Sequence, residues 1–168
     1  MIVVLMGVSG AGKTVIGTLL AERSGATFAD ADDYHPAANK QKMHSGHPLT
    51  DADRQPWLER LNLLLHQWFE ANQSGVLACS ALKQQYRETL ASGMPPDAIS
   101  FCLLEVPREL LEQRLAERHH EFMTPKLLSS QLATLETPKD AWIVKNDRTP
   151  DEVVSEILSH ISSQQQPS

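Results

Sequence analysis

The chain has 168 residues, of which 41% are hydrophobic and 21% are charged. These proportions indicate one globular domain that needs no disulfide or structural metal, and they exclude a mostly disordered or fibrous chain. The formal net charge of −6 argues against general binding to nucleic acids or to anionic membranes.

The apolar runs of the sequence are short. None approaches the roughly 20 residues of a membrane-spanning helix, and no basic segment precedes the first run at residues 2–6, as it would in a signal peptide. Cys79 and Cys102 lie inside apolar runs without the spacing of a metal site, so buried reduced thiols are favoured over a metal or redox role. These features predict a cytoplasmic protein that binds no membrane.

Strand-like and helix-like segments alternate along the chain. Strands are predicted at residues 2–6, 27–29, 76–79, 99–104 and 142–144, and helices at residues 13–23, after Thr50, after Pro107 and from about Pro150. Thr50, with Asp53 three residues later, is typical of a helix N-cap. The alternation predicts one α/β domain with a parallel sheet over residues 1–162, followed by a disordered tail at 163–168.

A complete phosphate-binding loop follows the first predicted strand. It reads Gly7-Val8-Ser9-Gly10-Ala11-Gly12-Lys13-Thr14 and matches the pattern G-x-x-x-x-G-K-[ST]. The glycines let backbone N–H groups surround phosphate oxygens, and the following helix directs its positive end at the same anion. Lys13 is therefore predicted to contact the β- and γ-phosphates of ATP or GTP, and Thr14 to ligate Mg²⁺. The strand before the loop and the helix after it argue against a chance glycine-rich turn.

Two acids, Asp30 and Asp32, follow the second predicted strand. Alternate residues of a strand end point the same way, so both can face the phosphate loop. One can then hold hydrated Mg²⁺ while the other takes a proton from an attacking hydroxyl. A solvated acidic turn is the alternative, which the neighbouring phosphate loop disfavours.

Two groups of basic residues follow the second and third predicted strands. The first includes His35, Lys42 and Arg54, and the second contains Lys83 and Arg87, which are four residues apart and are expected on one helix face. On an acidic chain this local reversal of charge suits a small anionic acceptor, because ammonium and guanidinium groups bind carboxylates. Ordinary solvated surface is the alternative for either group.

Arg114 and Arg118 are also four residues apart, near the end of the helix after the fourth strand. Residues 118–128 then form a polar segment that contains proline. This pattern predicts a lid that closes over the transferring phosphoryl group and excludes water. An ordinary helix end, where arginine and histidine suit the helix dipole, is the alternative.

Taken together and in this order, the motifs resemble the gluconate kinase (gluconokinase) family. Besides the phosphate loop, the resemblance rests on Asp30-Ala31-Asp32-Asp33-Tyr34-His35-Pro36, Pro48-Leu49-Thr50-Asp51, Cys79-Ser80-Ala81-Leu82-Lys83 and Ser130-Gln131. The chain departs from the family's pattern in the lid, where His120 and Glu121 stand in place of the usual Gly and His.

The resemblance implies a P-loop kinase fold with a five-stranded parallel sheet in the order 2-3-1-4-5. It also implies a homodimer that phosphorylates D-gluconate on its 6-hydroxyl with Mg²⁺ and ATP, for sugar-acid catabolism. Combined with the motifs above, it gives catalytic roles to Lys13, Asp32 and Arg118, ATP binding to residues 7–14 and Arg114, Mg²⁺ binding to Thr14 and Asp30, and substrate binding to Asp32, His35, Lys42, Arg54, Lys83 and Arg87. The alternatives are a kinase for another aldonate or a shikimate-like acid, and an ATP-binding regulator without catalysis.

Overall fold

The computed structural model describes residues 1–117 and 124–165. Five parallel strands form one sheet in the order β2-β3-β1-β4-β5, which confirms the predicted fold class and strand order. The strands are β1 (Ile2–Met6), β2 (Thr27–Asp30), β3 (Gly75–Ala78), β4 (Ser100–Glu105) and β5 (Trp142–Lys145), close to the apolar runs of the sequence.

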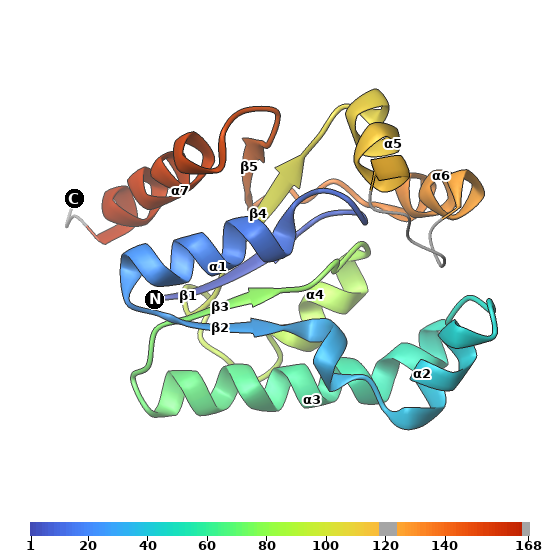
Figure 1. Cartoon of the computed structure of the whole chain (residues 1–168). Coiled ribbons are helices and arrows are strands. Elements are labelled where there is room, and N and C mark those ends of the chain that lie inside the picture. Colours follow the sequence, from blue (N-terminus) through green and yellow to red (C-terminus); the bar gives the residue numbers. More distant parts are fainter. Residues whose placement is uncertain (118–123, 166–168) are drawn as a thin grey trace.

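Helices cover both faces of the sheet (Figure 1). On one face lie α1 (Lys13–Ser24) and α7 (Pro150–Gln165), and on the other lie α3 (Asp51–Glu70) and α4 (Gln84–Leu90). Side chains of β1 alternate between the two layers: Val3 and Leu5 pack with α1 and α7, whereas Val4 and Met6 pack with α3. Burial on both faces explains why this strand is apolar throughout.

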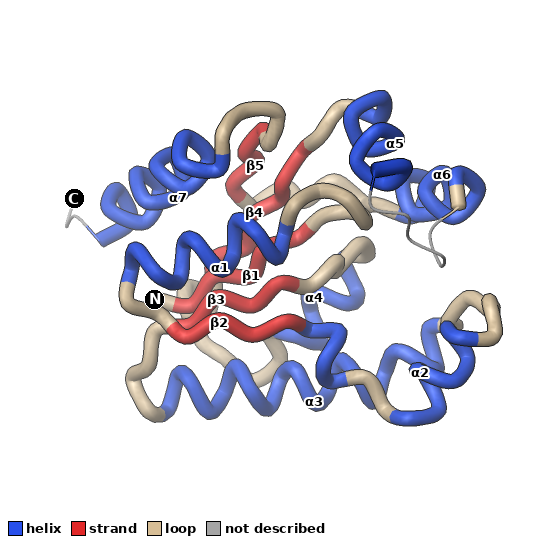
Figure 2. Tube along the Cα trace, in the orientation of Figure 1, coloured by secondary structure: helices blue, strands red, loops and turns tan. Residues whose placement is uncertain are grey.

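The remaining helices lie beyond the carboxyl ends of the strands (Figures 1 and 2). They are the 3₁₀ helix η1 (Ala31–Tyr34), α2 (Ala37–His44), α5 (Arg108–Glu117) and α6 (Pro125–Thr134). A small apolar cluster of Val8, Leu82, Leu111 and Leu128 joins the phosphate loop to the β3–α4 loop, α5 and α6. This packing fixes the loops at the edge of the sheet where ligands bind in α/β folds.

Two segments differ from the sequence predictions. The helix α7 continues through Gln165, so residues 163–165 are helical rather than part of a disordered tail. No glycine or proline interrupts the helix there, and the hydroxyl of Ser163 donates to the carbonyl of Ser159 at 3.0 Å. The predicted lid at 118–128 contains the first residues of α6, and its residues 118–123, among them Arg118, His120 and Glu121, lie outside the described residues.

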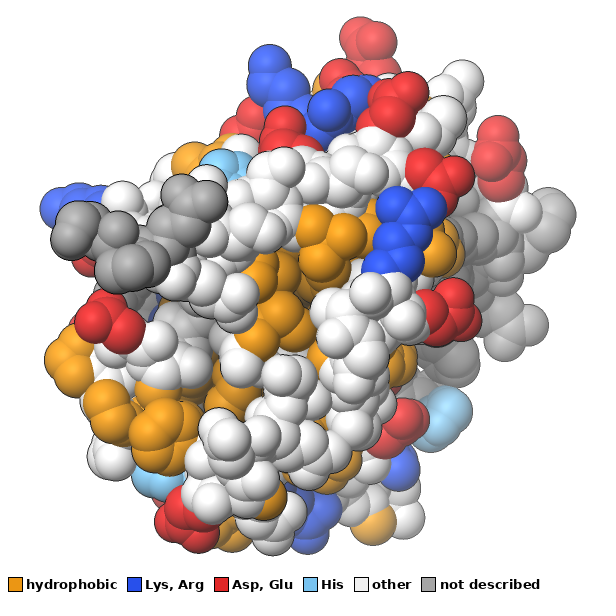
Figure 3. Space-filling model, turned by 90° about the vertical axis from the view of Figure 1, so that its left-hand side faces the viewer, with side chains coloured by type: hydrophobic (Ala, Val, Ile, Leu, Met, Phe, Trp, Pro, Cys, Tyr) orange, Lys and Arg blue, Asp and Glu red, His pale blue; other side chains and the backbone are white. Residues whose placement is uncertain are grey.

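No helix in residues 1–117 and 124–165 is long and apolar enough to cross a membrane. Figure 3 shows the side of the molecule that lies on the left in Figure 1, where hydrophobic side chains gather near the centre and charged side chains lie mostly around them. Cys79 and Cys102 are buried and free, as predicted from their apolar surroundings.

Candidate active site

The phosphate loop connects β1 to α1. Gly10 and Gly12 have φ angles of 86° and 93°, in the left-handed region that favours glycine. A Cβ atom at Gly12 would lie 2.4 Å from Nδ2 of Asn146. Gly12 is therefore required both for the backbone conformation and for the close approach of Asn146.

Lys13 reaches back over its own loop. Its ammonium donates to the carbonyls of Gly7 at 2.8 Å and Val8 at 3.0 Å. Burial lowers the pKa of Lys13, while the negative charges of Asp32 and Asp30 act in the opposite direction. The ammonium is thus held inside the anion-binding loop, where phosphate oxygens would be stronger acceptors than these neutral carbonyls.

The two predicted metal ligands lie together. The hydroxyl of Thr14 donates to Oδ2 of Asp30 at 3.2 Å, and the backbone N–H of Asp32 donates to Oδ1 of the same carboxylate at 3.0 Å. A hydroxyl and a carboxylate are oxygen ligands that suit Mg²⁺. In the described part of the chain, no group of three or more His, Cys, Asp or Glu residues could hold a metal ion. An ion at Thr14 and Asp30 would therefore be completed by water and phosphate oxygens, as is usual for Mg²⁺.

Asp32 presents a carboxylate to solvent beside this pair. Asp30 is the N-cap of η1, so the short helix turns Asp32 away from the strand, and its side chain is 86% exposed. Partial desolvation by the surrounding residues and the charge of Asp30 raise the pKa of Asp32, while the Lys13 ammonium lowers it. Because solvent reaches the group, it weakens these effects and leaves the carboxylate accessible to an incoming hydroxyl.

His35 is buried, contrary to the predicted contact with substrate. It is 7% exposed and stacks on Trp57 with ring centroids 4.3 Å apart. Burial, together with the charges of Arg54 and Lys40, lowers its pKa to about 4, so the imidazole is neutral near pH 7. Its Nε2 lies 4.0 Å from Oδ1 of Asp32, which places His35 behind the exposed carboxylate.

Two residues that the sequence prediction did not include hold His35 in place. The side-chain amide of Asn39 lies 3.2 Å from Nδ1 of His35 and donates to the carbonyl of Asp53 at 2.9 Å. The indole of Trp57 donates to the carbonyl of Ala31 at 2.7 Å. The polar sequence of α2 lacks an apolar period that would have identified this arrangement.

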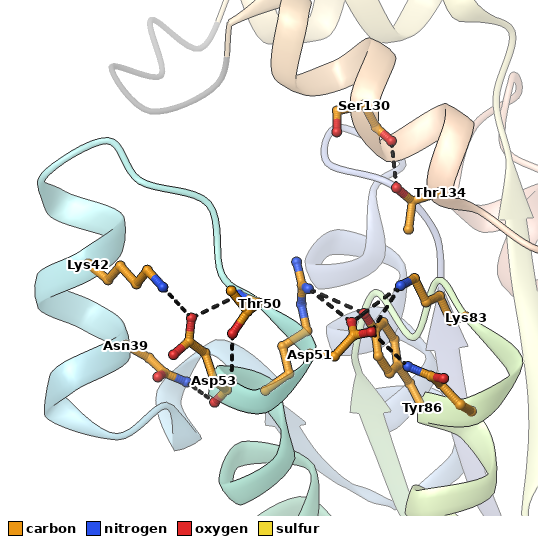
Figure 4. Close-up of polar contacts among 11 residues, drawn as sticks. Asn39, Lys42, Thr50, Asp51, Asp53, Lys83, Tyr86, Ser130 and Thr134 are labelled. Atoms are coloured by element: carbon orange, nitrogen blue, oxygen red, sulfur yellow. Dashed lines mark hydrogen bonds and ion pairs between the residues drawn. The ribbon is translucent and has the colours of Figure 1, made fainter.

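A carboxylate lies at the centre of the basic side chains beyond β3 (Figure 4). Asp51 accepts hydrogen bonds from the hydroxyl of Tyr86 at 2.5 Å, from the ammonium of Lys83 at 3.2 Å and from the amide of Gln85 at 3.1 Å. Arg54 lies 3.7 Å away and donates to the Tyr86 hydroxyl at 3.2 Å. We call Asp51, Arg54, Lys83, Gln85 and Tyr86 the Asp51 cluster. Hydrogen bonds from Tyr86 and Lys83 lower the pKa of Asp51.

Lys42 lies next to the N-terminus of α3 and pairs with Asp53 at 2.6 Å (Figure 4). Asp53 also accepts from the backbone N–H of Thr50 at 2.8 Å, while the Thr50 hydroxyl accepts from the N–H of Asp53. This capping box confirms the predicted N-cap. Lys42 therefore reaches the edge of the site with its charge already paired.

The structure corrects the prediction for Arg87. Lys83 is the N-cap of α4 and has an extended backbone, so the two residues do not share a helix face. Arg87 is 4% exposed and donates to the carbonyls of Ala81, Leu82 and Glu136 at 2.9, 3.1 and 2.5 Å. The left-handed φ of 43° at Ala81 belongs to the loop that directs the carbonyls of Ala81 and Leu82 at the guanidinium. Arg87 thus holds the β3–α4 loop and is not open to substrate.

Arg114, to which the resemblance assigns ATP binding, lies beside the phosphate loop. Its guanidinium donates to the carbonyl of Gly10 at 3.2 Å and to that of Asn146 at 2.8 Å. The side chain of Asn146, which is buried, donates to the carbonyl of Ala11 at 2.6 Å. Asn146 directly follows β5 (Trp142–Lys145), so the end of this strand is also held against the phosphate loop.

The carboxyl ends of β1, β2 and β3 therefore bring three parts together. They are an anion-binding loop with a buried lysine, an oxygen-rich pair beside an exposed carboxylate, and the Asp51 cluster. A phosphate loop next to an exposed carboxylate and cationic side chains is an arrangement suited to phosphoryl transfer onto a hydroxyl of an anionic acceptor.

Comparison with known proteins agrees with this assignment. The family described as "AAA domain" matches residues 2–138. The chain is 46% identical to a probable gluconokinase of Xenopus tropicalis, with 96% of this chain and 93% of the relative covered. It is 44% identical to a gluconokinase of Gluconobacter oxydans, with 96% and 91% covered.

A solved structure gives the same result. The crystal structure of a gluconokinase from Sinorhizobium meliloti superposes with a TM-score of 0.80 at 33% identity and covers 98% of this chain and 97% of that one. Sequence, fold and site geometry thus agree, and the chain belongs to the gluconokinase family of P-loop kinases.

Proposed function

We propose that the protein transfers the γ-phosphoryl group of ATP to the 6-hydroxyl of D-gluconate and so forms 6-phosphogluconate. The observation that carries this proposal is the placement of the phosphate loop, the exposed Asp32 and the Asp51 cluster at one edge of the sheet, in a member of the gluconokinase family. The first part fits a nucleotide, the second an attacking hydroxyl and the third a carboxylate.

On the donor side, the backbone N–H groups of residues 7–14 and the ammonium of Lys13 bind the phosphates of ATP. Lys13 leaves the carbonyls of Gly7 and Val8 for phosphate oxygens, because charged acceptors form stronger hydrogen bonds. Thr14 and Asp30 would hold Mg²⁺, which supplies positive charge to the β- and γ-phosphate oxygens. Arg114 keeps the loop against α5 through Gly10, and Arg118, which lies outside the described residues, is proposed as a charge that stabilises the transferring group.

On the acceptor side, Asp32 orients the 6-hydroxyl and takes its proton as the new P–O bond forms and the bond to the β-phosphate oxygen breaks. Neutral His35 lies behind Asp32 and limits its motion. Arg54 and Lys83 bind the carboxylate of gluconate, with Lys42 at the rim of the same region. Arg87 supports this subsite from beneath through the β3–α4 loop.

Residues 118–128 are proposed as the lid of the site, and the protein is proposed to act as a cytoplasmic homodimer, as the family resemblance implies. Sedimentation of the purified protein would give its oligomeric state.

A coupled assay of ADP release tests the proposed reaction. The protein is mixed with Mg-ATP and D-gluconate, other aldonates, shikimate or nucleoside monophosphates in turn. We expect turnover with D-gluconate at least about tenfold above that with the other acceptors, because a lost hydroxyl or a changed configuration leaves polar groups of the site unpaired. Faster turnover with another acid would mean that this acid, and not D-gluconate, is the acceptor. ATP binding without any acceptor-dependent turnover would identify a non-catalytic protein.

A further inference from the structure

The Asp51 cluster contains a carboxylate of the protein among the groups that are proposed to bind the carboxylate of the acceptor. Asp51 is the first residue of α3, where the helix dipole favours a negative side chain. Its side chain is 50% exposed, so it belongs to the surface that an acceptor meets. An acceptor carboxylate therefore has to bind next to a charge of its own sign.

Asp51 reduces the net positive charge of the cluster. Arg54 and Lys83 are positive, Asp51 is negative, and Tyr86 and Gln85 are neutral, so one net positive charge remains. The nearby ammonium of Lys42 adds nothing to this balance, because Asp53 pairs with it at 2.6 Å. With Asp51 present, the cluster attracts a negatively charged acceptor end less strongly than Arg54 and Lys83 would alone, and this reduction is larger for a doubly charged end than for a singly charged one.

The geometry also leaves room for such an acceptor. In the described part of the chain, Arg54 uses only Nη1 toward Tyr86 and Asp51. Its Nε and Nη2 donors remain for a ligand and form the fork that binds a planar carboxylate. Lys83 and Arg54 lie 5.6 and 5.5 Å from the centre of the Tyr86 ring, so one aromatic side chain supports both cations.

We propose that Asp51 is a specificity-determining residue whose fixed negative charge lowers the preference of the acceptor subsite for dianionic over monoanionic ends. This inference rests on the proposed function and deepens it. The hydrogen bonds from Tyr86, Lys83 and Gln85 keep the carboxylate ionised and in place. A dianionic end gains more from the two cations than a carboxylate does, but it also meets stronger repulsion from Asp51 at the same distance.

Three acceptors that differ only at carbon 1 test the proposal. D-glucitol is neutral there, D-gluconate carries one negative charge, and D-glucitol 1-phosphate carries about two near neutral pH; all three keep the primary hydroxyl at carbon 6. The ADP-release assay gives kcat/KM for each, and the readout is the ratio of the 1-phosphate to gluconate. We expect Asp51→Asn to raise this ratio about tenfold, since the net charge of the cluster rises by one.

Two further variants complete the experiment. Lys83→Gln lowers the net charge by one, and we expect it to move the ratio in the opposite direction. Glu59→Gln is the matched control, because Glu59 is an exposed carboxylate on the same helix that contacts Gln55 and not the cluster; its ratio should equal that of the wild type. Lys83→Gln provides the test on its own if Asp51→Asn does not fold.

Parallel losses with all three acceptors in Asp51→Asn would overturn the inference, because they are the result of a purely structural role. A shift of the ratio in the same direction in Lys83→Gln and Asp51→Asn would overturn it as well. Failure of the wild-type protein to phosphorylate gluconate would instead contradict the proposed function, so the two failures are distinguishable.

Discussion

Gln131 of α6 is hydrogen-bonded in both directions to Ser9 of the phosphate loop. The backbone N–H of Ser9 donates to Oε1 of Gln131 at 2.8 Å, and Nε2 of Gln131 lies 3.3 Å from the Ser9 hydroxyl. The helix α6 begins at Pro125, after its N-cap Thr124. One side chain therefore joins α6, whose first residues belong to the predicted lid, to the phosphate loop.

This contact leads to a prediction for nucleotide binding. Gln131→Ala removes two hydrogen bonds, each worth about 1 kcal/mol, so the loop loses part of its preorganised shape. We expect the KM for ATP to rise about three- to tenfold, while the KM for gluconate changes less than twofold. Steady-state kinetics with each substrate varied in turn give both values. Ser130→Ala, an exposed neighbour on the same helix, serves as the control, and an equal rise of both KM values would argue against a specific role in the loop.

Replacement of the proposed base should affect turnover rather than folding. Asp32→Asn keeps the shape of the side chain but cannot accept the proton, and we expect kcat to fall by roughly 10²–10⁴-fold. Because the Asp32 side chain is 86% exposed, the melting temperature should stay within a few degrees of that of the wild type. Asp33→Asn, an exposed neighbour, should keep normal turnover. Near-normal kcat in Asp32→Asn would remove Asp32 from the reaction.

Substitutions of Arg54 and Arg87 should have different effects, the first on the binding of gluconate and the second on the stability of the fold. We expect Arg54→Gln to raise the KM for gluconate at least about tenfold with little change in the KM for ATP, since the fork that binds the carboxylate is lost. Arg60→Gln, on the exposed surface of the same helix, is its control. A gluconate KM that is unchanged in Arg54→Gln would place the carboxylate elsewhere.

In contrast, Arg87→Ala removes the guanidinium donor from the carbonyls of Ala81, Leu82 and Glu136, and of these Leu82 keeps a hydrogen bond from the backbone N–H of Glu136. We expect the free energy of unfolding to fall by about 2–4 kcal/mol, because buried acceptors without partners are costly. Urea unfolding of the two arginine variants measures the difference. A stable Arg87→Ala protein with a raised gluconate KM would return Arg87 to the substrate site.

His35 makes stability depend on pH. Its pKa is lowered to about 4 in the folded protein, against about 6.5 in an unfolded chain. Between about pH 4 and pH 6.5 the imidazole takes up a proton in the unfolded chain but not in the folded protein. The stability that neutral His35 contributes is therefore complete above about pH 6.5 and is lost as the pH falls toward 4. The free energy of unfolding should fall by about 3 kcal/mol at most across this range.

Urea unfolding at pH 7 and pH 5 in His35→Gln and in the wild type isolates the contribution of this group. The free energy of unfolding should fall less between pH 7 and pH 5 in His35→Gln than in the wild type. An equal decrease in both proteins would mean that other groups cause the pH dependence.

Much of the fold could be predicted from the sequence because both faces of the central strands are buried, so runs such as Ile2–Met6 are apolar throughout. The phosphate loop was predictable for a different reason, since its backbone requires glycine at fixed positions such as Gly12. The helix α2 was not predicted, because it is polar along its length and only Asn39 is buried.

The acceptor region shows the limit of prediction from charge alone. Arg54, Lys83 and Arg87 look alike in the sequence, yet the first two lie at the surface and Arg87 is buried against main-chain carbonyls. The difference arises from the left-handed turn at Ala81, which no side-chain pattern signals. Asp51 was part of a recognised motif, but its place among the cations depends on how α3 and α4 meet.

The position of the new phosphate is the most direct test of the proposed reaction. The protein is incubated with Mg-ATP and D-gluconate, and the product is examined by ³¹P NMR without proton decoupling. Transfer to the 6-hydroxyl predicts a phosphomonoester signal split into a triplet by the two protons on carbon 6, and this signal should grow at the rate at which ADP forms. A doublet would mean transfer to a secondary hydroxyl, and the absence of any gluconate-dependent phosphomonoester would contradict the proposed function.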